Sequence, residues 1–157
     1  MKLSKILVAV DYSACSKHAL EYAGFLAQGM GAELHLLHAW DRPYYAREQD
    51  LVIGRGGGTP RTLTEVLEET AQEDMRAFIA SASIPDGVTV HHTVSSGAVA
   101  SVVVEHLKKG NYDLLITGTH GRTGFKHLLL GSVAERLVRV STVPVLTVPP
   151  PPEQRGE

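Results

Sequence analysis

Apolar runs alternate with amphipathic segments along the whole chain. Five runs rich in branched and aliphatic residues are typical of strands buried on both faces of a parallel sheet: 6–10, 33–40, 88–94, 113–117 and 143–148. Between them, four segments repeat apolar residues at the spacing of an α-helix: 19–27, 62–81, 98–109 and 132–140. The chain is therefore predicted to alternate strand and helix from end to end.

The residues flanking two of these helices predict where they begin and end. Hydroxyl side chains accept hydrogen bonds from the first free N–H groups of a helix, and glycine commonly follows the last turn. The first helix is expected to begin at Ser13 or Ser16 and to stop at Gly29 or Gly31. The second is expected to begin at Thr62 or Thr64.

Strict alternation of strand and helix predicts one α/β domain with three layers and a five-stranded, parallel, doubly wound sheet of the Rossmann-like kind. In such sheets ligands bind beyond the carboxyl ends of the strands, where the strand order reverses. We predict that residues 1–149 form this single domain and that the proline-rich tail 150–157 is disordered. The segment 41–61, rich in glycine and interrupted by prolines, is expected to be a long loop that could act as a lid.

Composition and charge exclude several classes of function. The formal net charge of -2 gives no general attraction for nucleic acid. No apolar stretch approaches the roughly 18 to 20 residues of a membrane span, and Asp11 ends the first apolar run too early for a signal sequence. The single cysteine, Cys15, excludes an internal disulfide and favours the cytoplasm, and its place in an amphipathic helix indicates a packing role.

The histidines do not suggest a metal site. His91 and His92 are adjacent on a predicted strand, and His35 and His38 differ in parity, so neither pair points to one face. We see no Cys, Asp or Glu at ligand spacing beside them. We therefore expect no zinc site built from these residues.

The most informative stretch follows the fourth predicted strand. Gly118-Thr119-His120-Gly121 is separated by nine residues from Gly131-Ser132, which opens the last helix. Glycines let a backbone approach a ligand closely, and a helix start offers amide groups and a positive dipole end to an anion. These features indicate phosphate binding, with the alternative that the glycines only turn the chain and Ser132 only caps the helix.

The spacing Gly-x-x-Gly, nine residues, Gly-Ser, between Leu-Leu-Ile-Thr and Val-Pro-Val-Leu, resembles the ATP-binding signature of the universal stress protein family. The first strand with its terminal Asp11, and His38-Ala39-Trp40 at the end of the second, also resemble that family, over about Lys5 to Val148. The resemblance implies an adenine nucleotide alpha hydrolase-like fold in which the first and fourth strands are neighbours. That arrangement would place Asp11 opposite Gly118.

The resemblance also implies a set of nucleotide-binding residues. These are Ala9, Val10, Asp11 and Ala39 beside the adenosine, Thr117 beside the nucleoside, and Gly118, Thr119, Gly121, Gly131, Ser132 and Val133 around ribose and phosphates, with Arg122, Lys126 and His127 as further candidates for phosphate contact. The implied cofactor is ATP with Mg²⁺ or Mn²⁺, and we assign no catalytic residue and no metal ligand. His120 is expected to act as scaffolding. Asp11 has the alternative role of a turn former or helix cap.

Two positions depart from the family pattern. Ala9 stands where a proline is frequent, and Gly97-Ala98-Val99 stands where Gly-x-Pro is common. Both departures concern the base pocket and leave the phosphate motif intact.

The leading hypothesis is a cytoplasmic, ATP-binding universal stress protein that responds to stress through a homodimer. Pro144 cannot donate to a sheet, which predicts an edge strand, and the family commonly pairs the strand at 143–148 with its twin across a two-fold axis. A capped monomer edge is the alternative. Two other hypotheses are a slow ATPase or phosphoryl- or adenylyl-transfer enzyme of the same fold, and a dimeric interaction module that binds no nucleotide.

Overall fold

The computed structural model describes residues 2–40, 50–53, 59–121 and 130–152. Along the chain its elements are β1 (Lys5–Ala9), α1 (Ala14–Met30), β2 (Glu33–Trp40), β3 (Leu51–Val52), β4 (Arg61–Thr62), α2 (Leu63–Ser81), β5 (Val90–Ser96), α3 (Val99–Gly110), β6 (Leu114–Gly118), α4 (Ser132–Val140) and β7 (Val145–Val148). Strand and helix alternate as the hydrophobic pattern predicts.

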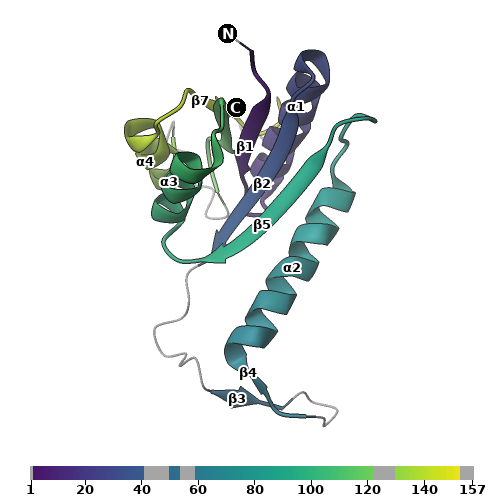
Figure 1. The fold of residues 1–157 in the computed structure, drawn as a ribbon, viewed down its shortest axis with the longest axis vertical. Helices are drawn as coiled ribbons and strands as arrows, with labels where there is room; N and C mark the ends of the chain where they lie inside the picture. Colours follow the sequence, from purple (N-terminus) through teal and green to yellow (C-terminus); the bar gives the residue numbers. More distant parts are fainter. Residues whose placement is uncertain (1, 41–49, 54–58, 122–129, 153–157) are drawn as a thin grey trace.

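The central sheet has the order β5-β2-β1-β6-β7, and every pair in it is parallel (Figure 1). The chain builds outward from β1 through β2 to β5, and then returns to add β6 on the other side of β1. The strand order therefore reverses between β1 and β6, which confirms that these two strands are neighbours at the switch point.

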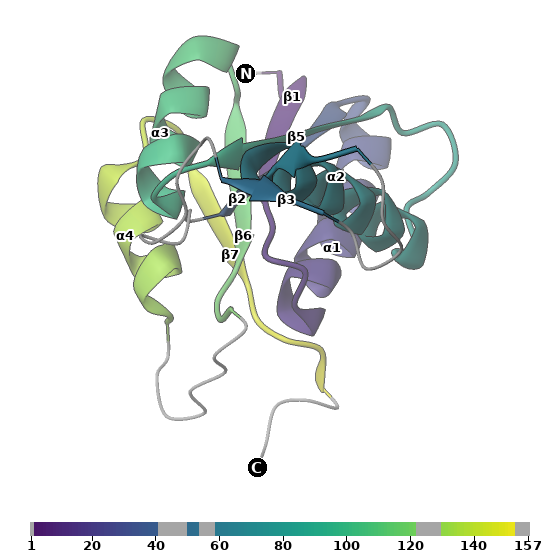
Figure 2. The ribbon, with the colours of Figure 1, turned by 90° about the horizontal axis from the view of Figure 1, so that it is seen from below.

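Two helical layers cover the two faces of this sheet, with α1 and α2 on one side and α3 and α4 on the other (Figure 2). Successive side chains of a strand point to opposite faces, so each strand contributes to two cores. The core under α1 and α2 is built on Ile6, Val8, Leu34 and Leu36. The core under α3 and α4 is built on Leu7, Ala9, Leu37 and Leu115.

The ends of α1 and α2 agree with local sequence rules. Ser13 caps α1 through a hydrogen bond accepted from the Ser16 N–H at 3.1 Å, and Gly31 ends it in the left-handed conformation at φ 65°. Thr62 and Glu65 form a reciprocal capping box at the start of α2. The hydrogen bond from the Thr62 N–H holds the pKa of the Glu65 carboxyl below its ordinary value.

The beginning of β1 is tied to the beginning of β6. The Asp113 Oδ2 atom accepts hydrogen bonds from the backbone N–H groups of Ser4 and Lys5, at 2.8 and 2.9 Å. These donors, with the Ser4 hydroxyl, lower the pKa of the Asp113 carboxyl because they stabilise its charged form. The strand that borders the switch point is thus anchored at its amino end.

Three segments differ from the prediction by more than one residue. The segment 41–61 is not loop throughout, since Leu51–Val52 pairs with Arg61–Thr62 in a short antiparallel ladder. Residues 41–49 and 54–58 of this segment lie outside the described part, and the prediction of a lid falls on them. The predicted strand at 88–94 begins and ends two residues later, because its pairing with β2 continues to Trp40. The predicted strand at 143–148 begins at Val145, directly after Pro144.

Pro144 still joins the sheet through its carbonyl, which accepts a hydrogen bond from the Leu115 N–H at 3.0 Å. β7 occupies the sheet edge, as the proline predicts.

Within the described ranges, the structure contains no helix of the length and apolarity that a membrane crossing requires. The predicted disordered tail falls mainly on 153–157, outside the described residues.

Candidate functional site

A pocket of about 450 Å³ lies at the carboxyl ends of β1, β2 and β6, next to the start of α4. This is the position that the reversal of strand order predicts for a ligand site. Its lining includes every predicted nucleotide-binding residue that the structure describes: Ala9, Val10, Asp11, Ala39, Thr117, Gly118, Thr119, Gly121, Gly131, Ser132 and Val133. Arg122, Lys126 and His127 lie outside the described residues.

Asp11 forms a tight turn after β1. Its Oδ1 atom accepts the Ser13 N–H at 3.0 Å, and its own N–H donates to the Ser16 hydroxyl at 3.3 Å. Asp11 therefore forms a turn, whereas Ser13 is the helix cap. Oδ2 lies against Gly121, since a Cβ atom added to that glycine would approach it to 2.6 Å. Asp11 and Gly121 can lie this close at the switch point because Gly121 carries no side chain.

Tyr12 adopts a backbone conformation that is rare for a residue with a side chain, with φ at 64°. Its ring stacks on His38 at a centroid distance of 4.1 Å, and its hydroxyl donates to the Ala71 carbonyl in α2 at 3.2 Å. These contacts hold the strained turn beside Asp11. Strain of this kind is retained where the surrounding structure fixes it, commonly near functional sites.

His38, for which the sequence motif His38-Ala39-Trp40 predicted no separate role, is part of the pocket wall. Its Nδ1 atom lies 2.8 Å from the Val10 carbonyl oxygen, so Nδ1 carries a proton and donates it. This bond ties the end of β2 to the end of β1. Sequence reasoning also missed Trp40 and Val99 in the wall. The position of Trp40 at the end of a strand was the available signal.

The loop after β6 is fixed by close packing. A Cβ atom at Gly118 would lie 2.9 Å from the Cys15 Sγ atom. Cys15 is buried, as its expected packing role requires, and its thiol lies 3.5 Å from the Val148 carbonyl. Thr119 donates its N–H to the same carbonyl at 2.9 Å and accepts the Gly131 N–H on its own carbonyl at 2.7 Å. Thr119 therefore links β7 to the start of α4.

His120 stands in the pocket wall and also supports the loop. Its Nδ1 atom lies 2.9 Å from the Thr119 hydroxyl oxygen. This contact agrees with the scaffolding role expected for His120.

Among the described residues, no side chain caps the start of α4, which faces the pocket. Gly131 is the cap residue, with φ −70° and ψ 156°, and makes no side-chain cap hydrogen bond; Ser132 is the first helical residue. The alternative in which Ser132 caps this helix is therefore wrong. The Gly131 N–H is used by Thr119, so the amides offered to a ligand are those of the residues that follow. Amides and the positive dipole end of a helix together favour an anion at this end of the pocket.

The expectation about histidines was incomplete because it compared residues within single strands. The register between β2 and β5 sets His35 opposite His91, and Glu33 lies two residues before His35 on the same face of β2. These three side chains gather near the amino ends of the strands, away from the pocket described above. The Glu-x-His spacing in the second predicted strand was a signal for the pairing of Glu33 with His35.

An open parallel sheet, helices on both faces and a pocket at the switch point define a doubly wound α/β protein with a ligand-type crevice. The chain belongs to the universal stress protein family, whose pattern it matches over residues 2–149. It is 31% identical to universal stress protein MJ0531 of Methanocaldococcus jannaschii over 151 residues, which cover 96% of this chain and 84% of that protein. It is 29% identical to universal stress protein YxiE of Bacillus subtilis, covering 92% and 98% of the two chains.

Solved structures show the same fold. The structure of the hypothetical protein MJ0577 has a TM-score of 0.71 at 26% identity and covers 95% of this chain and 97% of that one. A universal stress protein in complex with cAMP has a TM-score of 0.63 at 21% identity, covering 96% and 100%. Both similarities extend over almost the whole chain.

Proposed function

We propose that this protein binds an adenine nucleotide, ATP with Mg²⁺ or Mn²⁺, in the pocket at the switch point, and that nucleotide occupancy alters a homodimer. One observation carries the proposal. Residues from β1, β2, β6 and α4, far apart in the sequence, converge on a single pocket whose lining matches the set that the family signature implies. The volume of about 450 Å³ suits a small organic ligand.

The chemistry of the wall assigns the two ends of a nucleotide to the two sides of the pocket. Ala9, Val10 and Ala39 offer a mainly apolar surface for the base, with Asp11 as a polar partner for base or ribose. The glycine loop and the start of α4 offer backbone groups and the positive helix end to phosphates. In this proposal Thr117 borders the nucleoside, Gly118, Thr119, Gly121, Gly131, Ser132 and Val133 surround ribose and phosphates, and Arg122 contacts phosphate.

The oxygen atoms present suit a hard divalent cation. Mg²⁺ is commonly held by one or two protein oxygens together with substrate phosphates and water. Asp11 supplies a carboxylate and Ser132 a hydroxyl to the pocket wall. The cation would neutralise phosphate charge, and these two side chains would be the groups that hold it.

Related proteins support the choice of an adenine nucleotide. Universal stress proteins have been solved in complex with cAMP, with dAMP and with AMP. These proteins are 16% to 21% identical to this chain. Their ligands are the compounds to test first on this protein.

The dimer belongs to the same proposal. β7 lies at the sheet edge with Pro144 before it, and an exposed strand edge is a template for pairing with a second copy. The proposed unit is the domain 1–149, with the tail outside it, and the lone cysteine favours a cytoplasmic location.

The first experiment is to denature freshly purified protein, identify released nucleotides by mass spectrometry, and then titrate ATP with and without Mg²⁺ by calorimetry. We expect about one nucleotide per chain. Replacing Gly131 with valine places bulk where an added Cβ atom already lies 3.2 Å from the Thr119 carbonyl oxygen, and should weaken ATP binding at least roughly tenfold. Gly29→Ala is the control, because nothing lies within 4 Å of that position.

An unchanged ATP affinity in the folded Gly131→Val variant would refute the phosphate assignment. A protein that carries no nucleotide and ignores added ATP would leave the nucleotide-free dimer module. Rapid multiple turnovers would instead support the enzyme hypothesis. Sedimentation with and without ATP tests the dimer, and a monomer in both conditions would remove that part of the proposal alone.

A further inference from the structure

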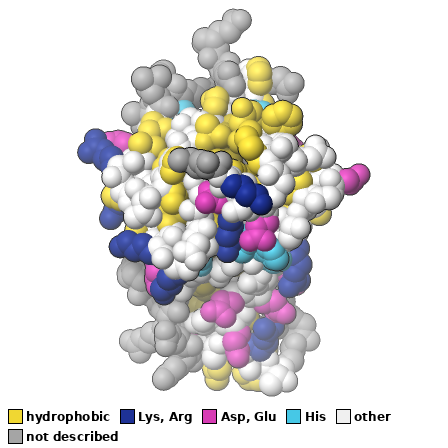
Figure 3. Space-filling model, turned by 45° about the horizontal axis from the view of Figure 1, so that its top comes forward, with side chains coloured by type: hydrophobic (Ala, Val, Ile, Leu, Met, Phe, Trp, Pro, Cys, Tyr) yellow, Lys and Arg dark blue, Asp and Glu magenta, His cyan; other side chains and the backbone are white. Residues whose placement is uncertain are grey.

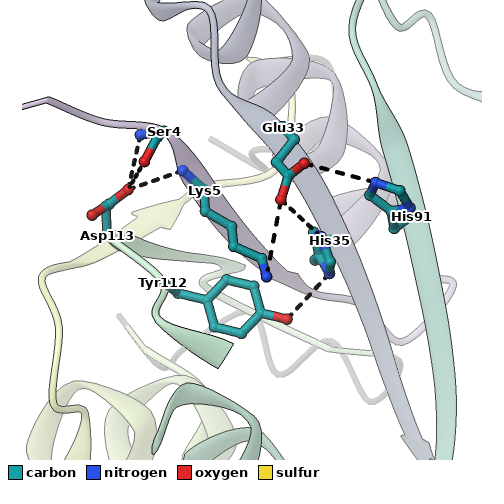
Figure 4. Close-up of polar contacts among 7 residues, drawn as sticks. All are labelled: Ser4, Lys5, Glu33, His35, His91, Tyr112 and Asp113. Atoms are coloured by element: carbon teal, nitrogen blue, oxygen red, sulfur yellow. Dashed lines mark hydrogen bonds and ion pairs between the residues drawn. The ribbon is translucent and has the colours of Figure 1, made fainter. Parts of the chain in front are cut away.

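A second cluster of polar side chains lies toward the amino ends of the strands. Glu33 and His35 project from the same face of β2, and His91 joins them from the neighbouring strand β5 (Figure 4). The two imidazole rings lie 4.6 Å apart between centroids. The cluster shares no residue with the lining of the switch-point pocket.

The donor atoms of the three side chains face one another. His35 Nε2 lies 3.3 Å from Glu33 Oε1, and His91 Nε2 lies 3.8 Å from Glu33 Oε2. One ligand atom from each side chain can be chosen so that all three lie within 4.8 Å of one another. Ligands of a tetrahedral zinc ion are about 3.4 Å apart, so small rotations would complete the site.

The surroundings of His35 suit a metal ligand. Its Nδ1 atom lies 3.2 Å from the Tyr112 hydroxyl oxygen, whereas its Nε2 atom is buried and forms no hydrogen bond within the described part of the chain. With the proton on Nδ1 and donated to Tyr112, the Nε2 lone pair would point into the cluster, which is how metal-binding histidines are commonly oriented.

The cluster is open on one side, since 52% of the His91 side chain and 39% of the Glu33 side chain are exposed. Water can therefore occupy a remaining coordination position.

We propose that Glu33, His35 and His91 bind a divalent transition-metal ion of the zinc class, with water as the fourth ligand. Two imidazole nitrogens and one carboxylate form a donor set typical of Zn²⁺ sites that keep an open position. Tyr112 is a positioning residue that acts through His35. Gly110 makes room for it, because a Cβ atom at that position would collide with the Tyr112 ring.

Lys5 sets the affinity of this site. Its Nζ atom lies 3.9 Å from Glu33 Oε1 and 4.8 Å from the centre of the Tyr112 ring. The ammonium group and a metal ion would therefore compete for the same carboxylate. In Figure 3 basic, acidic and histidine side chains lie next to one another near the middle of the face shown. Removing the Lys5 charge should strengthen metal binding.

The test uses the full, untagged chain without nucleotide, with Zn²⁺ followed by calorimetry and Co²⁺ by its visible absorption. We expect one ion per chain and the intense absorption of tetrahedral Co²⁺. His91→Asn should weaken Zn²⁺ binding at least about tenfold and abolish the Co²⁺ band. His92→Asn is the matched control, because His92 is the next residue of β5, is exposed and points to the other face.

Two further variants test the surroundings of the site. Lys5→Met should tighten Zn²⁺ binding by roughly tenfold through loss of charge repulsion. Tyr112→Phe should weaken it by about tenfold or more, through loss of the bond that orients His35. Equal Zn²⁺ affinity for His91→Asn and the wild type, or a wild type that binds no Zn²⁺, would overturn the proposal. ATP titration of the same variants keeps the two sites distinguishable, since His91→Asn should bind ATP as the wild type does.

Discussion

Introducing a negative charge at the start of α4 should change folding stability and ATP binding in opposite directions. Ser132 is the first residue of this helix, and the cap before it is a glycine with no side-chain hydrogen bond. An acidic group in the first helical turn stabilises a helix by about 0.3–1 kcal/mol. Ser132→Asp should therefore raise the free energy of unfolding by that amount.

The same charge should repel the phosphates of a bound nucleotide. Two like charges about 5 Å apart repel by roughly 1–3 kcal/mol for effective dielectric constants between those of water and a protein surface. That energy corresponds to an ATP affinity about 5- to 150-fold weaker. Added salt should reduce the loss, because the charges lie near solvent.

Calorimetric titration with ATP and with adenosine, both without a divalent cation, together with urea unfolding, checks both effects. Ser132→Asn serves as the neutral control of nearly the same shape. Adenosine carries no phosphate, so its affinity should be the same in all three proteins. If Ser132→Asp bound ATP as tightly as Ser132→Asn, or lost ATP and adenosine equally, the placement of phosphate at the start of α4 would be refuted.

Three further predictions concern stability. Gly24→Ala and Gly29→Ala both improve helix propensity in α1, but only Gly24→Ala puts a methyl group 2.9 Å from a ring carbon of Pro85. In urea unfolding, Gly24→Ala should therefore be less stable than Gly29→Ala by about 1–3 kcal/mol. Thr62→Ala removes the cap of α2 and should lower the free energy of unfolding by about 1 kcal/mol, whereas Thr64→Ala, at the second residue of the helix, should not; equal losses would contradict the capping box. The lowered pKa of Asp113 means that its charged form stabilises the fold above its ordinary value of 3.8, and that this contribution is lost as the pH falls below it. Thermal unfolding of wild type and Asp113→Asn should therefore differ at pH 7 and converge in acid, and a constant difference would refute this assignment.

Sequence reasoning succeeded where a structure depends on neighbouring residues. Thr62 was one of two candidate caps of α2, and the structure selects it because its hydroxyl accepts the N–H of Glu65, three positions on. The candidates for the ends of α1 likewise included Ser13 and Gly31, which the structure selects over Ser16 and Gly29. The two-residue strands β3 and β4 were missed because they are too short to show an alternating pattern.

The switch-point pocket was foreseen only in part. The glycine loop and the start of α4 could be recognised because they form a spaced motif in one stretch of chain. His38 and Tyr12 could not be placed, because their stacking depends on α2 reaching the turn after β1, where Ala71 accepts the Tyr12 hydroxyl, and on a backbone conformation that is unusual for tyrosine. No local rule predicts that conformation.

The sequence by itself determined the order of strands and helices, the pairs of candidate caps that include Ser13 and Thr62, and the position of the phosphate-type motif after β6. These features follow from hydrophobic spacing and from hydrogen bonds between residues a few positions apart. Only the tertiary structure decided that His35 and His91 are neighbours and that Tyr112 reaches them. Strand register is fixed by the packing of the whole sheet against both helical layers, so residues distant in sequence meet only when the complete fold forms.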